Sequence, residues 1–252
     1  MSQAASPNVA QLRMPNIAPL RNVLLLRKVM EQLMNRSANL PGIGVFYGQA
    51  GLGKSNACAA AAAAYRAVYI EMRSHFTKKS FLLAILAEMG VKPERTTSEM
   101  AEQICDQLMR SRQPLILDEG DYLVKRGLID LVRDIYEGSS AAILLVGEER
   151  FPANLAKISE RFYDRVLAWQ PAERADMEDT RKLARLYSPD VDIKDELLAE
   201  VLKASRGITR RIAVNIENVR AEAKKAGKRA IDSDGWGGKA FFTGEAPVRR
   251  GA

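Results

Sequence analysis

The residues with the clearest chemical meaning form the run Gly48-Gln49-Ala50-Gly51-Leu52-Gly53-Lys54-Ser55. Its spacing fits Gly-x-x-x-x-Gly-Lys-Ser, the phosphate-binding loop known as the P-loop. Glycines let successive backbone N–H groups turn toward a phosphate, in conformations that a side chain would block. Lys54 can reach the β- and γ-phosphates of ATP, and the Ser55 hydroxyl can bind Mg²⁺. All eight residues are therefore predicted to bind the nucleotide, with Mg²⁺ as a second cofactor.

The flanks of this loop have the character that the motif requires. Residues 43–47 are apolar and predict a buried strand, and the alanine-rich residues 56–65 predict a helix. That helix adds its positive dipole end and its free N–H groups to the phosphate site. A chance glycine-rich turn would not combine both flanks with a Lys-Ser ending, so we favour the P-loop.

A second candidate group is the run Leu115-Ile116-Leu117-Asp118-Glu119, in which two acids follow an apolar strand. This is the Walker B pattern. We expect Asp118 to support Mg²⁺ through water, and Glu119 to polarise an attacking water as general base. Such a run alone often marks only the end of a strand. Its place beyond the P-loop in an alternating pattern of strands and helices strengthens the interpretation.

Strands and helices alternate over the first two thirds of the chain. Further strands are predicted at 67–71, 114–118, 142–146 and 166–169, and helices at 21–36, 80–89, 96–110, 122–137 and 152–163. Such alternation predicts an α/β fold with a parallel sheet that helices cover on both faces. Ligands of such sheets lie at the carboxyl ends of the strands, which is where the P-loop begins.

The composition changes after Pro171, where the strand pattern stops and three helices are predicted, at 177–187, 194–205 and 209–225. The chain is therefore divided into four parts: a flexible segment (1–19), an α/β nucleotide-binding domain (20–170), a small helical domain (171–226) and a basic tail (227–252). The tail is rich in glycine and charge, and we expect it to be disordered.

Bulk properties set further limits. The net charge of +7 favours a polyanionic partner without proving one. Apolar runs fall short of the roughly 20 residues that span a bilayer, and the N-terminal residues lack the core of a signal peptide. We therefore expect a cytoplasmic protein without a membrane partner. Cys58 and Cys105 read as reduced core thiols, and together with His75 they do not form a zinc pattern.

The two nucleotide motifs, followed by a helical domain, resemble the AAA+ ATPases over about residues 12–225. The resemblance implies a five-stranded parallel sheet with a C-terminal helical lid, and a nucleotide between them at a boundary between subunits. It also implies roles for three more residues. Glu148 stands where a polar sensor of the γ-phosphate is found, although a solvated loop acid is an equal alternative.

Two arginines complete the site that the resemblance implies. Arg161 matches the arginine finger, which acts on the nucleotide of a neighbouring subunit, and Arg165 is the second choice. The alternative for both is a local ion pair, which we prefer for Arg165. Arg210 matches the sensor arginine of the lid, which contacts the phosphates of the nucleotide.

Within the AAA+ ATPases, the chain resembles the transposition ATPases, which select target DNA for bacteriophage Mu and for bacterial transposons. Residues 12–20, the run Leu-Asp-Glu-Gly-Asp at 117–121 and the run Ser-Glu-Arg-Phe at 159–162 carry this likeness. It implies that ATP drives assembly of a ring or helical filament of this chain on double-stranded DNA. The assembly would mark target DNA and stimulate a transposase in a bacterial or phage-infected cell, and hydrolysis would dismantle it.

Basic residues that could bind DNA lie in two expected loops. Arg73, Lys78 and Lys79 flank the loop after the second strand, and Lys125 and Arg126 follow the Walker B run. In rings of this fold both regions can line the central channel, where they would meet DNA phosphates without reading sequence. The alternative is that these charges belong to solvated loops.

Other classes of function share parts of the nucleotide site. A helicase loader or chaperone-type ATPase would use the same nucleotide residues, but would act on a protein ring and touch single-stranded DNA. A small-molecule kinase is disfavoured because a kinase must exclude water, whereas Glu119 is placed to activate it. A P-loop protein without turnover is the remaining alternative, if its assembly lacks the arginine finger.

Overall fold

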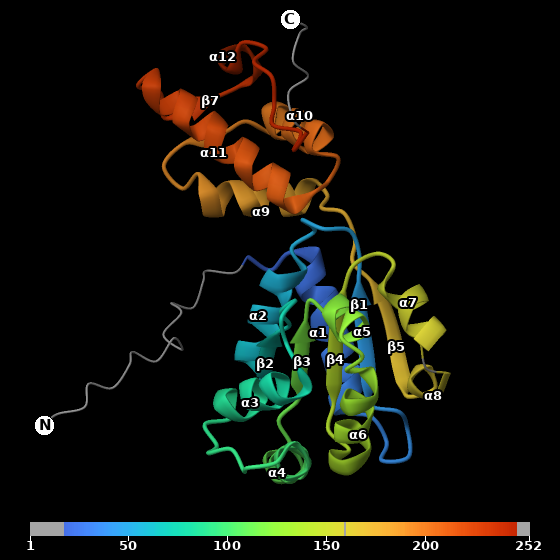
Figure 1. Ribbon diagram of the computed structural model, residues 1–252. Helices are drawn as coiled ribbons and strands as arrows, with labels where there is room; N and C mark the ends of the chain where they lie inside the picture. The colour runs from blue at the N-terminus through green and yellow to red at the C-terminus, as the bar shows by residue number, and fades with distance from the viewer. Residues whose placement is uncertain (1–17, 159, 246–252) are drawn as a thin grey trace, which may run out of the picture.

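The computed structural model of the protein describes residues 18–158 and 160–245, and consists of an α/β core with a helical lid at one end (Figure 1). Five parallel strands form the core sheet in the order β2-β3-β4-β1-β5. Their bounds are β1 Ile43–Tyr47, β2 Val68–Glu71, β3 Leu115–Asp118, β4 Ile143–Gly147 and β5 Val166–Pro171. The predicted α/β fold with a five-stranded parallel sheet is confirmed.

Helices cover both faces of the sheet, which explains why the central strands are almost wholly apolar. On one face, Phe46, Ile116 and Leu144 pack against α1 (Arg21–Met34) and α2 (Lys54–Tyr65). Alternate strand residues turn to the other face. There they meet α3 (Lys78–Glu88), α4 (Thr97–Ser111) and α6 (Ile129–Ser139). The two apolar clusters hold the carboxyl ends of the strands at one edge.

Helix boundaries agree with the local sequence signals in most places. A capping box opens α4, because Thr96 Oγ1 accepts a hydrogen bond from the Glu99 N–H and the Glu99 carboxylate accepts one from the Thr96 N–H. An equivalent box with Thr77 and Ser80 opens α3. These caps satisfy backbone donors that the first helical turn leaves unpaired.

The helix expected at 122–137 is instead two helices, α5 (Asp121–Lys125) and α6. Gly127 has a φ of +63°, a left-handed conformation that ends α5. The Leu128 N–H then donates to the Leu123 carbonyl at 2.8 Å, and both leucines are buried. The region expected as one helix at 152–163 holds α7 (Phe151–Ile158) and α8 (Glu160–Tyr163).

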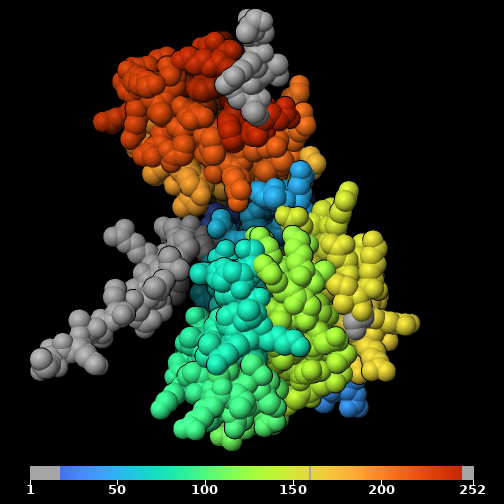
Figure 2. Space-filling model, viewed as in Figure 1, coloured from blue at the N-terminus to red at the C-terminus, as the bar shows by residue number. Residues whose placement is uncertain are grey.

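The lid consists mainly of the three predicted helices, α9 (Met177–Tyr187), α10 (Asp195–Ser205) and α11 (Thr209–Lys225). Their apolar faces form a separate cluster that includes Leu197, Val201 and Ile216. The lid also contains a feature that the sequence did not indicate, a short parallel pair of β6 (Asp192–Ile193) and β7 (Ala230–Ile231). Figure 2 shows the lid as a separate mass above the core.

The prediction that the tail is disordered is wrong for residues 228–245, which fold onto the lid. They include α12 (Ser233–Trp236), whose Trp236 is only 5% exposed and stacks on Phe241 with a centroid distance of 5.3 Å. The buried Asn215 amide of α11 also exchanges two hydrogen bonds with the Phe242 backbone. Trp236 belongs to the apolar cluster of the lid, and Phe241 packs against that cluster. Residues 246–252 lie outside the described part of the chain.

The segment expected to be flexible, residues 1–19, lies outside the described residues up to position 17, as does most of the 12–20 stretch. Where the described chain begins, Leu20 is buried against the lid cluster, and the Lys182 ammonium donates to the Pro19 carbonyl at 2.9 Å. The start of α1 is therefore anchored to the lid. Among the described helices, none is long and apolar enough to cross a membrane.

Candidate nucleotide-binding site

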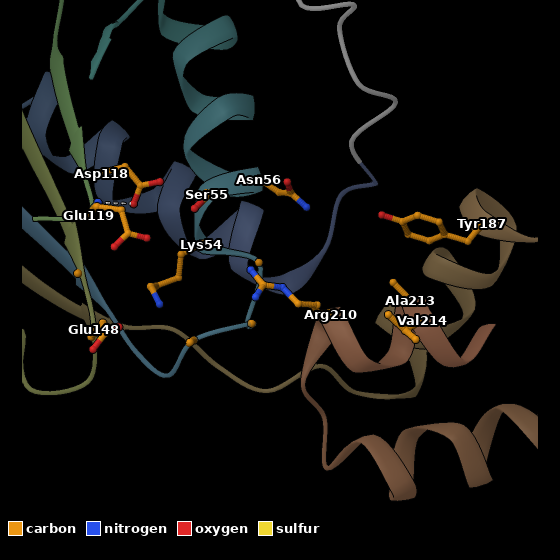
Figure 3. A pocket seen from close by; sticks show the side chains of 14 residues that line it. Lys54, Ser55, Asn56, Asp118, Glu119, Glu148, Tyr187, Arg210, Ala213 and Val214 are labelled. Carbon is orange, nitrogen blue, oxygen red and sulfur yellow. Dashed lines mark hydrogen bonds between the residues drawn. The ribbon is translucent and has the colours of Figure 1, made fainter. Parts of the chain in front are cut away.

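A cavity of about 350 Å³ lies between the carboxyl edge of the sheet and the lid (Figure 3). The P-loop, the ends of β3 and β4, and helices α9 and α11 all contribute to its lining. The structure brings together most of the predicted nucleotide residues here: Ala50, Gly51, Gly53, Lys54, Ser55, Asp118, Glu119, Glu148 and Arg210. The cavity has the polar and charged lining that the phosphates of a nucleoside triphosphate require.

The P-loop has the backbone geometry that its glycines predict. Gly51 and Gly53 both have a φ of +85°, in the left-handed region that side chains disfavour. A Cβ atom on Gly48 would lie 2.9 Å from the Ala172 Cβ, so this glycine is needed for close packing. Helix α2 begins immediately after the loop, at Lys54, so its N-terminal dipole points into the cavity.

The Lys54 side chain folds back onto the loop. Its ammonium donates to the carbonyls of Gly48 at 2.7 Å and Gln49 at 3.1 Å. Burial lowers the pKa of Lys54, and the carboxylates of Asp118 and Glu119 oppose that shift. The lysine is therefore partly desolvated, a state in which a phosphate is a strong partner.

Asp118 is the most buried acid of the cavity, with 2% of its surface exposed. Its Oδ1 accepts a hydrogen bond from the Glu119 N–H at 2.8 Å, and its Oδ2 accepts one from the Tyr69 hydroxyl at 3.1 Å. Tyr69 was not among the predicted site residues. Burial, followed by the charge of Asp118, raises the pKa of Tyr69, so this phenol keeps its proton at neutral pH and donates a hydrogen bond to Asp118.

Glu119 points into the cavity and has an unusual backbone. Its φ is +54°, a conformation that is uncommon for residues other than glycine. Desolvation in the cavity raises the pKa of Glu119, although the residue remains exposed, and the neighbouring charge of Asp118 adds to the shift. A carboxylate with a raised pKa is a better proton acceptor, as a general base must be.

The loops after β3 and β4 are tied together by Asp121, which sequence reasoning did not single out. Its carboxylate is 7% exposed and accepts a hydrogen bond from the Glu148 N–H at 2.7 Å. The Gly120 N–H also donates to the Val146 carbonyl at 2.7 Å. This network places Glu148 at the cavity wall, where the sensor interpretation puts it. The only sequence signal for Asp121 was its membership of the run at 117–121.

The lid rests directly on the P-loop. The Arg210 N–H donates to the Gly51 carbonyl at 3.0 Å, and the Thr209 hydroxyl donates to the Leu52 carbonyl at 3.2 Å. The Arg210 side chain extends from the start of α11 into the cavity, toward the loop that carries Lys54 (Figure 3). The predicted lid arginine therefore lies beside the phosphate-binding loop.

A buried asparagine connects the P-loop to the hinge between core and lid. The Asn22 Nδ2 donates to the Leu52 carbonyl at 2.9 Å and to the Glu173 carbonyl at 2.7 Å, and its Oδ1 accepts from the Glu173 N–H at 2.8 Å. Beside it, Arg21 forms ion pairs with Glu173 and Asp176. Sequence reasoning missed Asn22, because its partners lie 30 and 151 residues away.

The two candidate finger residues do not line the cavity of their own chain. Arg161 is exposed on α8, and forms no ion pair within the described residues. Arg165 is paired with Glu137 at 3.2 Å, which is the local ion pair that we preferred for it.

The predicted DNA-binding residues also lie outside the cavity. Arg73, Lys78 and Lys79 are exposed between the end of β2 and the start of α3. Lys125 and Arg126 are exposed at the end of α5, with the Lys125 ammonium 5.0 Å from the centre of the Tyr122 ring. All five cations face solvent and are available to a polyanion.

The cavity suits Mg²⁺ that arrives together with phosphate. Across the described residues, no group of three or more His, Cys, Asp or Glu side chains could hold a metal ion. The donors at hand are the Ser55 hydroxyl and the Asp118 carboxylate, both of which line the cavity. Mg²⁺ prefers such a set, in which one or two protein oxygens are completed by waters and phosphates.

Comparisons with known proteins agree with this geometry. Residues 37–155 match the family model described as an AAA domain. No curated protein matches the sequence. The ORC2 protein of Aeropyrum pernix in its ADP form has a similar structure, with a TM-score of 0.62 and 15% identity over 85% of this chain and 65% of that one.

Two other solved structures show the same likeness. The ORC1 protein of Aeropyrum pernix in complex with DNA gives a TM-score of 0.61 at 19% identity, over 90% of this chain and 66% of that one. Domain III of the Thermotoga maritima replication initiation protein DnaA gives a TM-score of 0.57 at 19% identity, over 91% of this chain and 95% of that one. The chain spans about two thirds of each ORC protein. Its fold is that of the P-loop AAA+ ATPases, with the C-terminal helices of that class.

Proposed function

We propose that the protein is a Mg²⁺-dependent ATPase that assembles on duplex DNA, and that ATP turnover limits the lifetime of the assembly. The observation that supports the enzymatic part is the convergence of Lys54, Asp118, Glu119 and Arg210 on one cavity between core and lid. These residues come from three separate segments of the chain: the P-loop, the end of β3 and the start of α11. A purely structural loop would not require them to meet.

Each residue has a distinct task in this proposal. The P-loop N–H groups and Lys54 would hold the phosphates, and Arg210 would contact them from the lid. Ser55 and Asp118 would hold Mg²⁺, which offsets charge on the β- and γ-phosphate oxygens. Glu119 would accept a proton from the water that attacks the γ-phosphorus, while the bond to the bridging oxygen breaks.

We infer self-association from the exposed position of Arg161 outside the cavity, taken together with its match to an arginine finger. Because this residue lies outside the cavity of its own chain, it would complete the site of a neighbour, where its guanidinium would stabilise the transition state. Hydrolysis would then require an assembly. The exposed cations after β2 and at the end of α5 would hold the assembly on DNA phosphates, with weak dependence on sequence and strong dependence on salt.

The finer proposal is a role in transposition, in which the assembly marks target DNA and stimulates a transposase. The runs at 117–121 and 159–162 support it, together with the net charge of +7. The alternative is a loader-type ATPase that acts in DNA replication. The structural likeness to ORC and DnaA proteins, at 15–19% identity, supports the fold that both candidates share and does not decide between them.

Electron microscopy of the purified protein with duplex or single-stranded DNA separates these candidates. The protein would be imaged with ATP, a non-hydrolysable ATP analogue or ADP. Rings or filaments on duplex DNA that require ATP, persist with the analogue and are lost with ADP would support the transposition proposal. Assemblies that form only on single-stranded DNA, or no assembly with any nucleotide, would overturn it and favour the loader.

A further inference from the structure

Both carboxylate oxygens of Asp118 are held by the protein. The Tyr69 hydroxyl donates to Oδ2 at 3.1 Å, and the Glu119 N–H donates to Oδ1 at 2.8 Å. The three residues form a hydrogen-bonded network that extends from β2 to the loop after β3. This network joins a tyrosine with no assigned role to the predicted metal-binding residue, Asp118, and the predicted base, Glu119.

The sheet explains why Tyr69 reaches Asp118. In the parallel pair of β2 and β3, Tyr69 lies opposite Ile116, and Asp118 is two residues further along β3. Side chains two residues apart share a face of the sheet, and a long aromatic side chain can reach such a diagonal neighbour. Tyr69 therefore packs with Ile116 on the α2 face and extends its hydroxyl toward the carboxyl edge.

The two hydrogen bonds hold the Asp118 carboxylate in place and leave some of its acceptor positions open. An ionised carboxylate has about four acceptor positions, so two protein donors leave room for metal-bound waters. The bond to the Glu119 N–H also has a second effect, because Glu119 has a φ of +54°. By accepting from this N–H, the Asp118 side chain stabilises the uncommon backbone conformation of Glu119. Fixing Asp118 therefore also fixes the backbone that carries Glu119.

We propose that Tyr69 is a positioning residue of the nucleotide site, which orients Asp118 toward Mg²⁺ and, through Asp118, holds Glu119 in place. The inference rests on the proposed ATPase function and deepens it. It assigns to one hydroxyl group an influence on both metal binding and base catalysis. Outer partners of metal ligands commonly change metal affinity by about 10–100-fold when removed.

The test compares Tyr69→Phe with Tyr65→Phe. Both substitutions remove only a hydroxyl from a half-buried tyrosine on the α2 side of the sheet. The Tyr65 hydroxyl bonds to the Arg27 carbonyl at 3.4 Å, away from the cavity, so Tyr65→Phe is the matched control. Binding of a fluorescent ATP analogue would be measured in EDTA and over a Mg²⁺ titration, followed by kcat at saturating Mg²⁺.

Tyr69→Phe should leave ATP affinity in EDTA unchanged and raise the half-maximal Mg²⁺ concentration by about tenfold or more. It should also lower kcat at saturating Mg²⁺, because Glu119 loses its support. In an Asp118→Asn background the same substitution should have no further effect, since its route of action is gone. Tyr65→Phe should match the wild type in every measurement.

Three results would overturn the inference, and they are distinguishable. If ATP binding by the wild type responds to Mg²⁺ and Tyr69→Phe responds equally, only the proposed role of Tyr69 is overturned. Wild-type ATP binding that does not respond to Mg²⁺ at all would overturn the proposed function, and this inference with it. If Tyr69→Phe weakens the response to Mg²⁺ equally in the wild type and in Asp118→Asn, the route through Asp118 is refuted.

Discussion

Replacement of Asn22 by alanine should loosen both the lid and the P-loop. The amide makes three hydrogen bonds to backbone groups of Leu52 and Glu173, and Asn22 is only 5% exposed. Alanine would remove all three hydrogen bonds in a site that water reaches poorly, and among the described residues only the Leu52 carbonyl would keep another partner, the Thr209 hydroxyl. At about 0.5–1.5 kcal/mol for each of the three net hydrogen bonds, the loss of stability should total about 1.5–4.5 kcal/mol.

This loss converts into a measurable shift of the melting temperature. For chains of about 150–250 residues, each kcal/mol corresponds to about 2–4 °C, so Tm should fall by about 3–18 °C. Circular dichroism of the nucleotide-free protein measures this directly. Asn35→Ala is the matched control, because Asn35 follows the same helix but is exposed and forms no side-chain hydrogen bond within the described chain.

A second variant makes the reasoning sharper. Asn22→Asp keeps an acceptor for the Glu173 N–H but turns a second oxygen toward the Leu52 and Glu173 carbonyls. Repulsion between these oxygens should make it no more stable than Asn22→Ala. Both variants should also bind ATP more weakly, because Leu52 belongs to the P-loop. If Asn22→Ala melts within about 1 °C of Asn35→Ala, the three side-chain hydrogen bonds of Asn22 contribute nothing to stability.

Four more predictions concern the nucleotide site. Lys54→Ala should weaken ATP binding at least about tenfold in a fluorescence titration, because it removes a charged phosphate donor. Glu119→Gln should bind ATP normally but lower kcat by about 10²–10⁴-fold in a phosphate-release assay; a wild-type rate would rule out Glu119 as the base. The pH profile of kcat should fall as the pH drops through the raised pKa of Glu119, and this limb should vanish in Glu119→Gln. Arg161→Ala should lower kcat by about 10³-fold without changing nucleotide binding by the monomer, whereas Arg165→Ala should not; equal effects of the two would exclude Arg161 as the finger.

The core fold was predictable because its signals are local. Apolar runs bounded by loops indicated all five strands, and β1 has the predicted bounds of 43–47. The capping box at Thr96 fixed the start of α4. The errors arose where a tertiary effect decides the structure. Gly127 ends α5 inside a region of helical periodicity, and the tail is ordered because Trp236 has a hydrophobic surface to cover.

The candidate site was predictable to the same extent. The P-loop and Walker B residues follow from short patterns with a known chemical purpose. Tyr69, Asp121 and Asn22 carry no such pattern, and each acts on a partner from another element. The sheet order, which sequence periodicity does not specify, brings β2 beside β3 and so places Tyr69 next to Asp118. Positioning residues of this kind are found only when the fold is known.

The central claim is that the cavity between core and lid binds and hydrolyses ATP. Its most direct test is phosphate release by the wild-type protein, with and without duplex DNA, in Mg²⁺ or in EDTA, alongside Lys54→Ala. We predict release that requires Mg²⁺, increases with protein concentration and DNA as the assembly forms, and is absent in Lys54→Ala. Release that is equal in the wild type and Lys54→Ala, or absent from the wild type under every condition, would contradict the claim.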